Sequence, residues 1–283
     1  MQGLSEPARP RLAYGFWRYR REDGDIALAA LAAAREAGID HLDTADIYGG
    51  GEFGGVEALL GSLRQRAPSL FAGASLATKA GVEPGSPYNS SPDYMARACE
   101  ASLKRLKLER IDLFYVHRPD ILTHPAELGA ALDALVQHGK AGAVGVSNFT
   151  PAQVDALRTH MTAPIASIQI EISAVEPSAI VDGRLDQAMR DGVSVLAWSP
   201  LAGGRLAAHA SVHAELAAIA AKYNVSIESV ALAFLLRHPA AITPIIGSTK
   251  PERITGLAQT SSLPLTRREW YAILEAALGR PMP

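Results

Sequence analysis

Four side chains in this sequence could together protonate an oxygen atom. Asp43 and Tyr48 lie in the stretch GIDHLDTADIYGG, and Lys79 and His117 end two later apolar segments. A phenol with its ordinary pKa of about 10 needs help to release a proton, and a neighbouring ammonium stabilises the phenolate. A carboxylate would keep a buried lysine charged. This predicts Tyr48 as a proton donor tuned by Lys79 and Asp43, with a neutral His117 binding a substrate carbonyl oxygen.

Other interpretations of these residues remain open. Asp43 by itself is also typical of a turn or a helix cap after a strand. Lys79 could form a Schiff base, as in a barrel aldolase, although Asp43, Trp198 and Arg253 would then have no role. We expect no metal site, because no His and carboxylate spacing suits one. A hydrolase is also disfavoured, since no serine or cysteine nucleophile stands beside His117 in a readable motif.

The composition narrows the class of partner. The chain has 27 Lys and Arg against 29 Asp and Glu, a net charge of -2, so it lacks the basic field that nucleic acid requires. No apolar run approaches the roughly 18 residues of a membrane span. The N-terminus lacks a signal-peptide pattern, and the single cysteine, Cys99, excludes an intrachain disulfide. We expect a cytoplasmic protein that binds neither membrane nor nucleic acid.

Short apolar segments alternate with amphipathic ones along the whole chain. The eight expected strands are residues 12–17, 39–43, 74–79, 111–117, 143–147, 166–171, 193–199 and 242–247. The expected helices are residues 26–38, 56–66, 92–106, 125–140, 151–160, 181–192, 214–223, 224–239 and 266–278.

This alternation predicts parallel strands joined by crossover helices, in a sheet covered on both faces. Eight such units predict an α/β protein with a (β/α)8 TIM-like barrel, a single domain over residues 1–283. Active sites of such barrels lie where the carboxyl ends of the strands converge. Polar residues end most of the expected strands, so we expect their side chains to meet at one mouth.

Six motifs along the chain resemble those of one protein family. DTADIYG, the strand-terminal TK, VHRPD, GVSNFTPAQ, LAWSPLAGG and PIIGSTKPERI occur in the order seen in aldo-keto reductases, closest to a bacterial branch of oxidoreductases. The resemblance extends from about Leu12 to the C-terminus. It implies NADPH-dependent reduction of an aldehyde or ketone on a barrel without a Rossmann domain. It also implies the roles given above for Tyr48, Asp43, Lys79 and His117.

The resemblance also implies which residues bind the cofactor. Ser147, Asn148 and Gln169 would hold the nicotinamide carboxamide, and Trp198 would stack on the ring. The loop Ser199, Pro200, Leu201, Ala202 and Gly203 would cover the pyrophosphate. Asp43 and three residues at the end of the first strand would also touch the cofactor: Gly15, Phe16 and Trp17.

The adenosine end is expected in GSTKPER. Its residues are Gly247, Ser248, Thr249, Lys250 and Arg253, with Arg253 on the 2′-phosphate. The chain departs from the family here, since many NADPH-using relatives carry lysine at the position of Gly247 and Glu-Asn at that of Gly256-Leu257; Lys250 would supply the missing charge. We therefore expect NADPH, with NADH as the less favoured cofactor.

The substrate is expected to be a small carbonyl compound bound by Trp17, Tyr48 and His117. Phe16, Tyr88 and Arg118 are further candidates for the substrate wall, and the sequence does not say which carbonyl compound is reduced. The remaining histidines, His213 among them, are expected on the surface or in packing. We expect a monomer or a weak homo-oligomer. The resemblance leaves one alternative, a cofactor-bound regulatory subunit like those of potassium channels.

Overall fold

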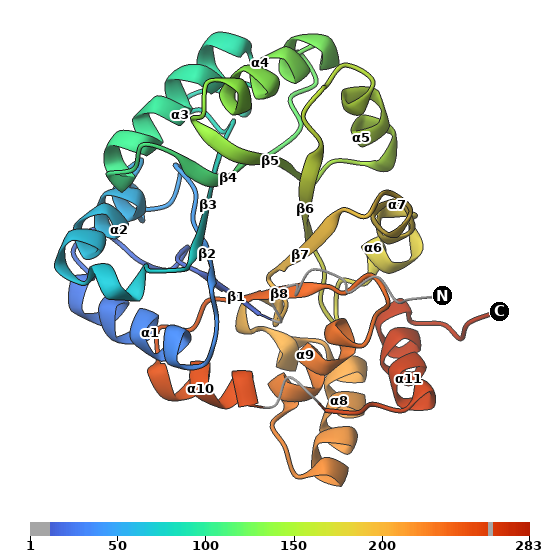
Figure 1. Cartoon of the computed structure of the whole chain (residues 1–283). Helices are drawn as coiled ribbons and strands as arrows, with labels where there is room; N and C mark the ends of the chain where they lie inside the picture. The colour runs from blue at the N-terminus through green and yellow to red at the C-terminus, as the bar shows by residue number, and fades with distance from the viewer. Residues whose placement is uncertain (1–11, 260–262) are drawn as a thin grey trace, which may run out of the picture.

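Eight parallel strands form a closed barrel in chain order, with β1 paired to both β2 and β8 (Figure 1). The computed structural model describes residues 12–259 and 263–283. The strands are β1 Ala13–Gly15, β2 His41–Asp43, β3 Ser75–Ala80, β4 Ile111–Val116, β5 Ala141–Ser147, β6 Ile165–Glu171, β7 Ser194–Trp198 and β8 Thr243–Ile246. This confirms the predicted fold class.

The strands are apolar because both faces of the barrel wall are covered. Phe114 and Val116 on β4 and Ile168 and Ile170 on β6 belong to the core under the helices. Tyr115, between the two β4 residues, belongs to a separate small cluster and donates a hydrogen bond to Ser167 of β6. All eight predicted strands are present, and their ends differ from the predictions by at most two residues.

The helices form a ring outside the barrel, seen end-on in Figure 1. They are α1 Gly24–Glu36, α2 Gly55–Arg66, α3 Pro92–Leu106, α4 Pro125–Gln137, α5 Pro151–Arg158, α6 Ser178–Val181, α7 Arg184–Asp191, α8 Ala210–Tyr223, α9 Ile227–Leu236, α10 Pro251–Gln259 and α11 Arg267–Leu278, with 3-10 turns η1 Pro68–Leu70, η2 Ala202–Gly204 and η3 Leu206–Ala208. Several begin at sequence-encoded caps: Thr150 and Gln153 form a capping box at α5, and Thr266 and Glu269 form another at α11.

Two local predictions were wrong. The segment 181–192 is not one helix, because Gly183 has φ 89° and separates α6 from α7. Only glycine adopts this left-handed conformation without strain. Trp17 does not continue the first strand; β1 ends at Gly15, and Trp17 lies in the following turn with half of its surface exposed.

Within the described residues, no single helix is long and apolar enough to span a membrane. The bent pair α8 and α9, which meet at 98°, reaches that length and apolarity only when taken together. α9 is buried from Ser229 to Leu235 against the barrel core.

Cys99 is a buried free thiol in α3. The extent of the domain, 1–283, stays a prediction, because residues 1–11 and 260–262 lie outside the described residues.

Candidate active site

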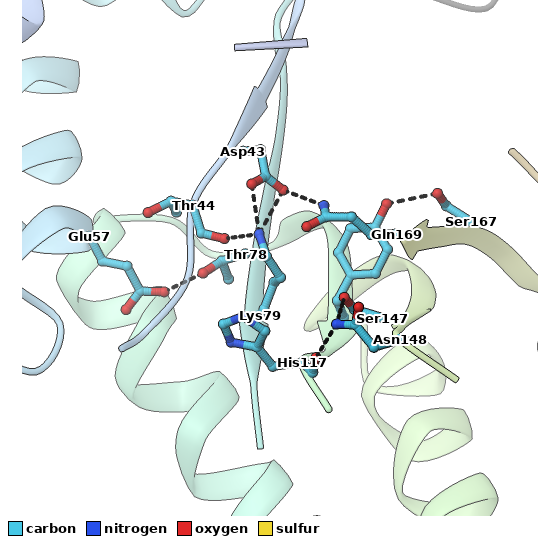
Figure 2. Close-up of polar contacts among 11 residues, drawn as sticks. Asp43, Thr44, Glu57, Thr78, Lys79, His117, Ser147, Asn148, Ser167 and Gln169 are labelled. Atoms are coloured by element: carbon cyan, nitrogen blue, oxygen red, sulfur yellow. Dashed lines mark hydrogen bonds and ion pairs between the residues drawn. The ribbon is translucent and has the colours of Figure 1, made fainter. Parts of the chain in front are cut away.

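A buried ion pair occupies the mouth end of the barrel interior (Figure 2). Lys79 Nζ donates to both carboxylate oxygens of Asp43, at 2.8 and 2.7 Å, and to the carbonyl oxygen of Thr44 at 2.7 Å. Gln169 Nε2 donates to Asp43 Oδ1 at 2.8 Å. The side chains of Lys79 and Asp43 are only 1% and 5% exposed. Such an ion pair is tolerated in the interior because further hydrogen bonds satisfy its remaining donors and acceptors.

Strand geometry places these groups. Asp43 ends β2, and Lys79 is the penultimate residue of β3. Since side chains alternate along a strand, Thr78 points away from Lys79 and donates to Glu57 Oε1 of α2 at 2.5 Å. Glu57 is fully buried and also accepts from Arg105 Nε of α3 at 2.7 Å. The outer contacts therefore hold β3 in position while Lys79 projects into the barrel.

Tyr48 and His117 lie beside this ion pair. Lys79 Nζ is 5.4 Å from the centre of the Tyr48 ring, and the Tyr48 and His117 rings meet edge to face with centres 5.9 Å apart. Burial raises the pKa of Tyr48, and Lys79 opposes that rise. Burial would lower the pKa of Lys79, but Asp43 and Tyr48 outweigh it and the pKa is raised. Tyr48 is thus a protonated phenol beside a charged ammonium.

The imidazole of His117 is neutral at physiological pH. Burial, together with the positive charges of Lys79 and Arg118, lowers the pKa of His117 to about 3. Its Nδ1 atom is buried and has no hydrogen-bond partner among the described residues. A neutral imidazole keeps one N–H donor and one acceptor, so His117 can donate to an oxygen that enters this corner.

The cluster opens into a cavity of about 900 Å³ that continues along the carboxyl ends of several strands. Most of the predicted site residues line it: Gly15, Trp17, Asp43, Tyr48, His117, Ser147, Asn148, Gln169, Trp198, Ser199, Pro200, Leu201, Gly203, Gly247, Ser248, Thr249, Lys250 and Arg253. Tyr88 and Arg118, expected in the substrate wall, line it too.

Three predicted residues do not line this cavity. Lys79 lies behind Asp43 and Tyr48 and is almost fully buried. Phe16 points into the core, where its ring packs edge to face on Tyr14 with centres 4.9 Å apart. Ala202 is buried in η2, with φ 51°. Its neighbours Leu201 and Gly203 reach the cavity in its place.

The middle of the cavity suits a carboxamide group. Asn148 Nδ2 donates to Ser147 Oγ at 2.8 Å, and Asn148 Oδ1 accepts from Trp198 Nε1 at 2.9 Å, which fixes the indole. Because Ser147 Oγ accepts this hydrogen bond, its hydroxyl hydrogen is free to donate to a ligand. Gln169 donates to Asp43 through Nε2, so its Oε1 atom is free to accept. One donor and one acceptor beside an aromatic face match an amide on an aromatic ring.

Two residues that directly follow strands at this edge of the barrel have a left-handed backbone conformation. Asn148 after β5 has φ 61°, and Ser199 after β7 has φ 50°. Residues other than glycine rarely adopt such values, which accumulate at functional sites. The left-handed turns redirect the chain directly after the strand, so Asn148 and Ser199 both face the cavity.

Two contacts from the first loop narrow the cavity. Trp17 packs over Gly247, so closely that a side-chain Cβ at residue 247 would lie 3.0 Å from Trp17 Nε1. Arg18 Nη2 donates to the carbonyl oxygen of Gly203 at 3.1 Å and links the first loop to the loop after β7. The glycine that departs from the family pattern therefore allows the Trp17 indole to approach the backbone closely.

The far end of the cavity carries several charges. Lys250 directly precedes α10, and Arg253 lies in its first turn. Glu228 comes from the first turn of α9. Arg253 Nη2 donates to Glu228 Oε1 at 3.1 Å. His213 of α8, which we expected on the surface or in packing, also lines this end of the cavity.

The family model described as "Aldo/keto reductase family" matches residues 11–277. The chain belongs to the aldo/keto reductase family. Its relatives include a 6-dehydroglucose reductase of Novosphingobium aromaticivorans, 44% identical over 99% of this chain and 96% of that protein, and the Escherichia coli oxidoreductase YdhF, 36% identical over 98% and 96%. The predicted family and the predicted class of enzyme, an NAD(P)H-dependent oxidoreductase, are confirmed.

Solved structures of aldo-keto reductases share this fold. The glycerol dehydrogenase AKR11B4 of Gluconobacter oxydans superposes with a TM-score of 0.84 at 28% identity, covering all of this chain and 95% of that one. A Klebsiella pneumoniae aldo-keto reductase, whose structure contains NADPH, has a TM-score of 0.79 at 26% identity and covers 97% and 92%.

Sequence reasoning missed several cavity residues of this aldo-keto reductase. Ile47 and Val82 lie within loops whose neighbouring residues carry the recognised motifs. Glu228 and His213 come from helices between β7 and β8, where no motif marks a site. A carboxylate in the first turn of a helix is typical of ordinary capping, so the position of Glu228 gave no signal.

Proposed function

We propose that this aldo-keto reductase uses NADPH to reduce an aldehyde or ketone to an alcohol. The observation that carries the proposal is the buried Asp43–Lys79 pair directly beside the Tyr48 phenol, at the mouth of the barrel. The NADPH-containing Klebsiella relative supports the choice of cofactor. The donor and acceptor at Ser147 and Gln169 beside Trp198 are suited to its nicotinamide end.

NADPH, when bound, supplies the hydride. His117 then binds the carbonyl oxygen with a neutral N–H, which polarises the carbonyl without giving up a proton. Tyr48 O–H delivers the proton to that oxygen as negative charge develops on it. Lys79 stabilises the phenolate left behind, and Asp43 holds Lys79 charged and oriented. The neighbouring positions of these four side chains support the proposal, because little reorganisation would be needed.

Both alternatives to a reductase lack a specific observation in their favour. A Schiff-base lysine must be neutral to attack a carbonyl, whereas Asp43 raises the pKa of Lys79. A regulatory binding subunit would need a partner surface, whereas the contacts among Asp43, Lys79 and Tyr48 are suited to proton transfer. Borohydride trapping on Lys79 in the presence of substrate would contradict the reductase proposal.

The relatives named 6-dehydroglucose reductase extend the proposal to the substrate, for which we infer a polyhydroxylated aldehyde. The candidate wall combines the aromatic faces of Trp17 and Tyr88 with the Arg118 guanidinium. Aromatic faces pack against the C–H surface of a sugar, and a guanidinium with five N–H donors suits its hydroxyl groups.

The test is a titration followed by an activity panel. Trp17 and Trp198 line the cavity, so binding of NADPH should change tryptophan fluorescence. With NADPH present, 6-dehydroglucose should be reduced faster than an apolar aldehyde such as hexanal. Binding of NADPH without reduction of any carbonyl compound would favour the regulatory subunit instead, and a preference for hexanal would contradict the substrate class alone.

A further inference from the structure

The end of the cavity where we expect the adenosine contains a carboxylate, that of Glu228. Arg253, expected to hold the 2′-phosphate, already donates to Glu228 Oε1 at 3.1 Å. Glu228 lies in the first turn of α9 and Arg253 in the first turn of α10, and both line the cavity. Arg253 therefore faces the cavity with a counter-ion in place.

The two cofactors differ at this point in charge and in hydrogen bonding. NADPH presents a 2′-phosphate, which repels a carboxylate and attracts an arginine. NADH presents a 2′-hydroxyl, which donates a hydrogen bond to a carboxylate, as acidic residues do to the ribose in other dinucleotide sites. Glu228 thus favours NADH, and Arg253 favours NADPH.

The ion pair is exposed enough to be exchanged. The side chains of Arg253 and Glu228 are 54% and 36% exposed, so the pair is solvated and weak. A phosphate can replace the Glu228 carboxylate as the partner of Arg253, but Glu228 then stays close to the phosphate without its cation. Lys250 also lines this end and is exposed, so it offers a second cation.

We propose that Glu228 is a specificity-determining residue that competes with the 2′-phosphate for Arg253 and so lowers the preference of this enzyme for NADPH over NADH. This inference rests on the proposed function, because it assumes a nicotinamide dinucleotide in the cavity. The two residues of this ion pair come from different helices, Glu228 from α9 and Arg253 from α10.

The experiment compares dissociation constants of NADP+ and NAD+, measured by tryptophan fluorescence at low salt. Glu228→Gln removes the charge and keeps the shape. We expect NADP+ to bind about fivefold more tightly, equivalent to about 1 kcal/mol, the upper range for an exposed charge contact. NAD+ should bind equally well or more weakly. The effect should shrink at 1 M salt, where the Debye length is about 3 Å.

The matched control is Glu252→Gln, which removes the same charge from an exposed residue next to Arg253 that does not line the cavity. It should change NADP+ binding less than twofold, on the scale of a screened surface charge. In an Arg253→Ala background, the gain from Glu228→Gln should also be smaller, because the competition has been removed.

Equal changes for the two cofactors, no change for either, or the same gain from Glu252→Gln would overturn the role of Glu228 while leaving the reductase proposal intact. Failure of the unaltered protein to bind either cofactor would overturn the proposed function, and this inference with it.

Discussion

The two ends of the cavity hold ion pairs of opposite character. At the catalytic end, Lys79 and Asp43 are 1% and 5% exposed and share further hydrogen bonds with Thr44 and Gln169. At the adenosine end, Arg253 and Glu228 are more than one third exposed and joined by a single contact. A buried pair cannot lose one partner without leaving a charge in the interior, whereas an exposed pair can exchange its partner for a ligand.

This difference in burial suggests that the two ion pairs have different roles. In the function proposed above, the buried pair would give Tyr48 the fixed electrostatic environment that acid catalysis requires. The exposed pair would be an exchangeable contact with the cofactor. We expect changes at the first pair to affect stability and chemistry, and changes at the second to affect cofactor choice with little effect on the fold.

The largest expected effect comes from breaking the buried pair. Asp43→Asn should lower the free energy of unfolding by about 3 kcal/mol, because Lys79 loses its counter-ion in the interior. Urea denaturation measures this change. Lys79→Met combined with Asp43→Asn should cost less than the sum of the two single changes, since the double variant leaves no unpaired charge.

The same substitution type at the exposed pair is the control. Glu228→Gln should change the free energy of unfolding by less than about 1 kcal/mol. Additive losses in the double variant at Asp43 and Lys79, or a loss at Glu228 as large as that at Asp43, would remove the distinction between the two pairs.

The next effect concerns the chemical step. Tyr48→Phe removes the proposed proton donor and keeps the ring, so carbonyl reduction should fall by about 10²-fold or more. NADPH affinity should stay within about twofold in fluorescence titrations, because the phenol acts on the substrate oxygen. Tyr271→Phe on the exposed surface of α11 is the matched control. Near-full activity of Tyr48→Phe would exclude Tyr48 as the acid.

A smaller effect is expected at the adenosine end. Arg253→Ala should weaken NADPH binding by about 1.5 kcal/mol, the lower range for a charged hydrogen bond, because Arg253 is exposed and must leave Glu228 to bind phosphate. NADH binding should hardly change. Arg268→Ala, an exposed position on α11, controls for the loss of positive charge. Equal losses for NADPH and NADH would mean that Arg253 does not contact the 2′-phosphate.

The smallest expected effect is on the pH dependence of the rate. Burial and two cations lower the pKa of His117 to about 3, so kcat should not fall through His117 titration between pH 7.5 and 5. A pH–rate profile at saturating cofactor measures this. An acid limb with a pKa between 6 and 7 that disappears in His117→Asn would contradict the assignment of a neutral imidazole.

The lowered pKa of His117 also makes the stability of the folded protein depend on pH. Unfolding would restore the ordinary pKa of His117, about 6.5, so the unfolded chain takes up a proton below that pH while the folded protein does not. The stability from neutral His117 is therefore complete above about pH 6.5 and decreases as the pH falls toward 3. His117→Asn should reduce this acid sensitivity in thermal unfolding.

Strand positions and the catalytic cluster could be predicted from the sequence, because both depend on local pattern. Parallel strands in a closed barrel end at one mouth, so polar residues that follow apolar segments must converge. Asp43, Tyr48 and His117 converge at this mouth in the structure, with Lys79 directly behind them. The roles assigned to them stay predictions, to be tested by the substitutions above.

The sequence by itself determined the alternation of strands and helices, the closed barrel that follows from it and the polar residues at its mouth. Only the tertiary structure decided that Phe16 packs into the core, that Trp17 covers Gly247 and that Glu228 reaches Arg253. Packing between segments far apart in the chain decides the direction in which a loop side chain points. It also decides which helices meet at the rim of the barrel. Residue periodicity describes how a segment buries its own side chains, but it does not specify which other segment lies opposite.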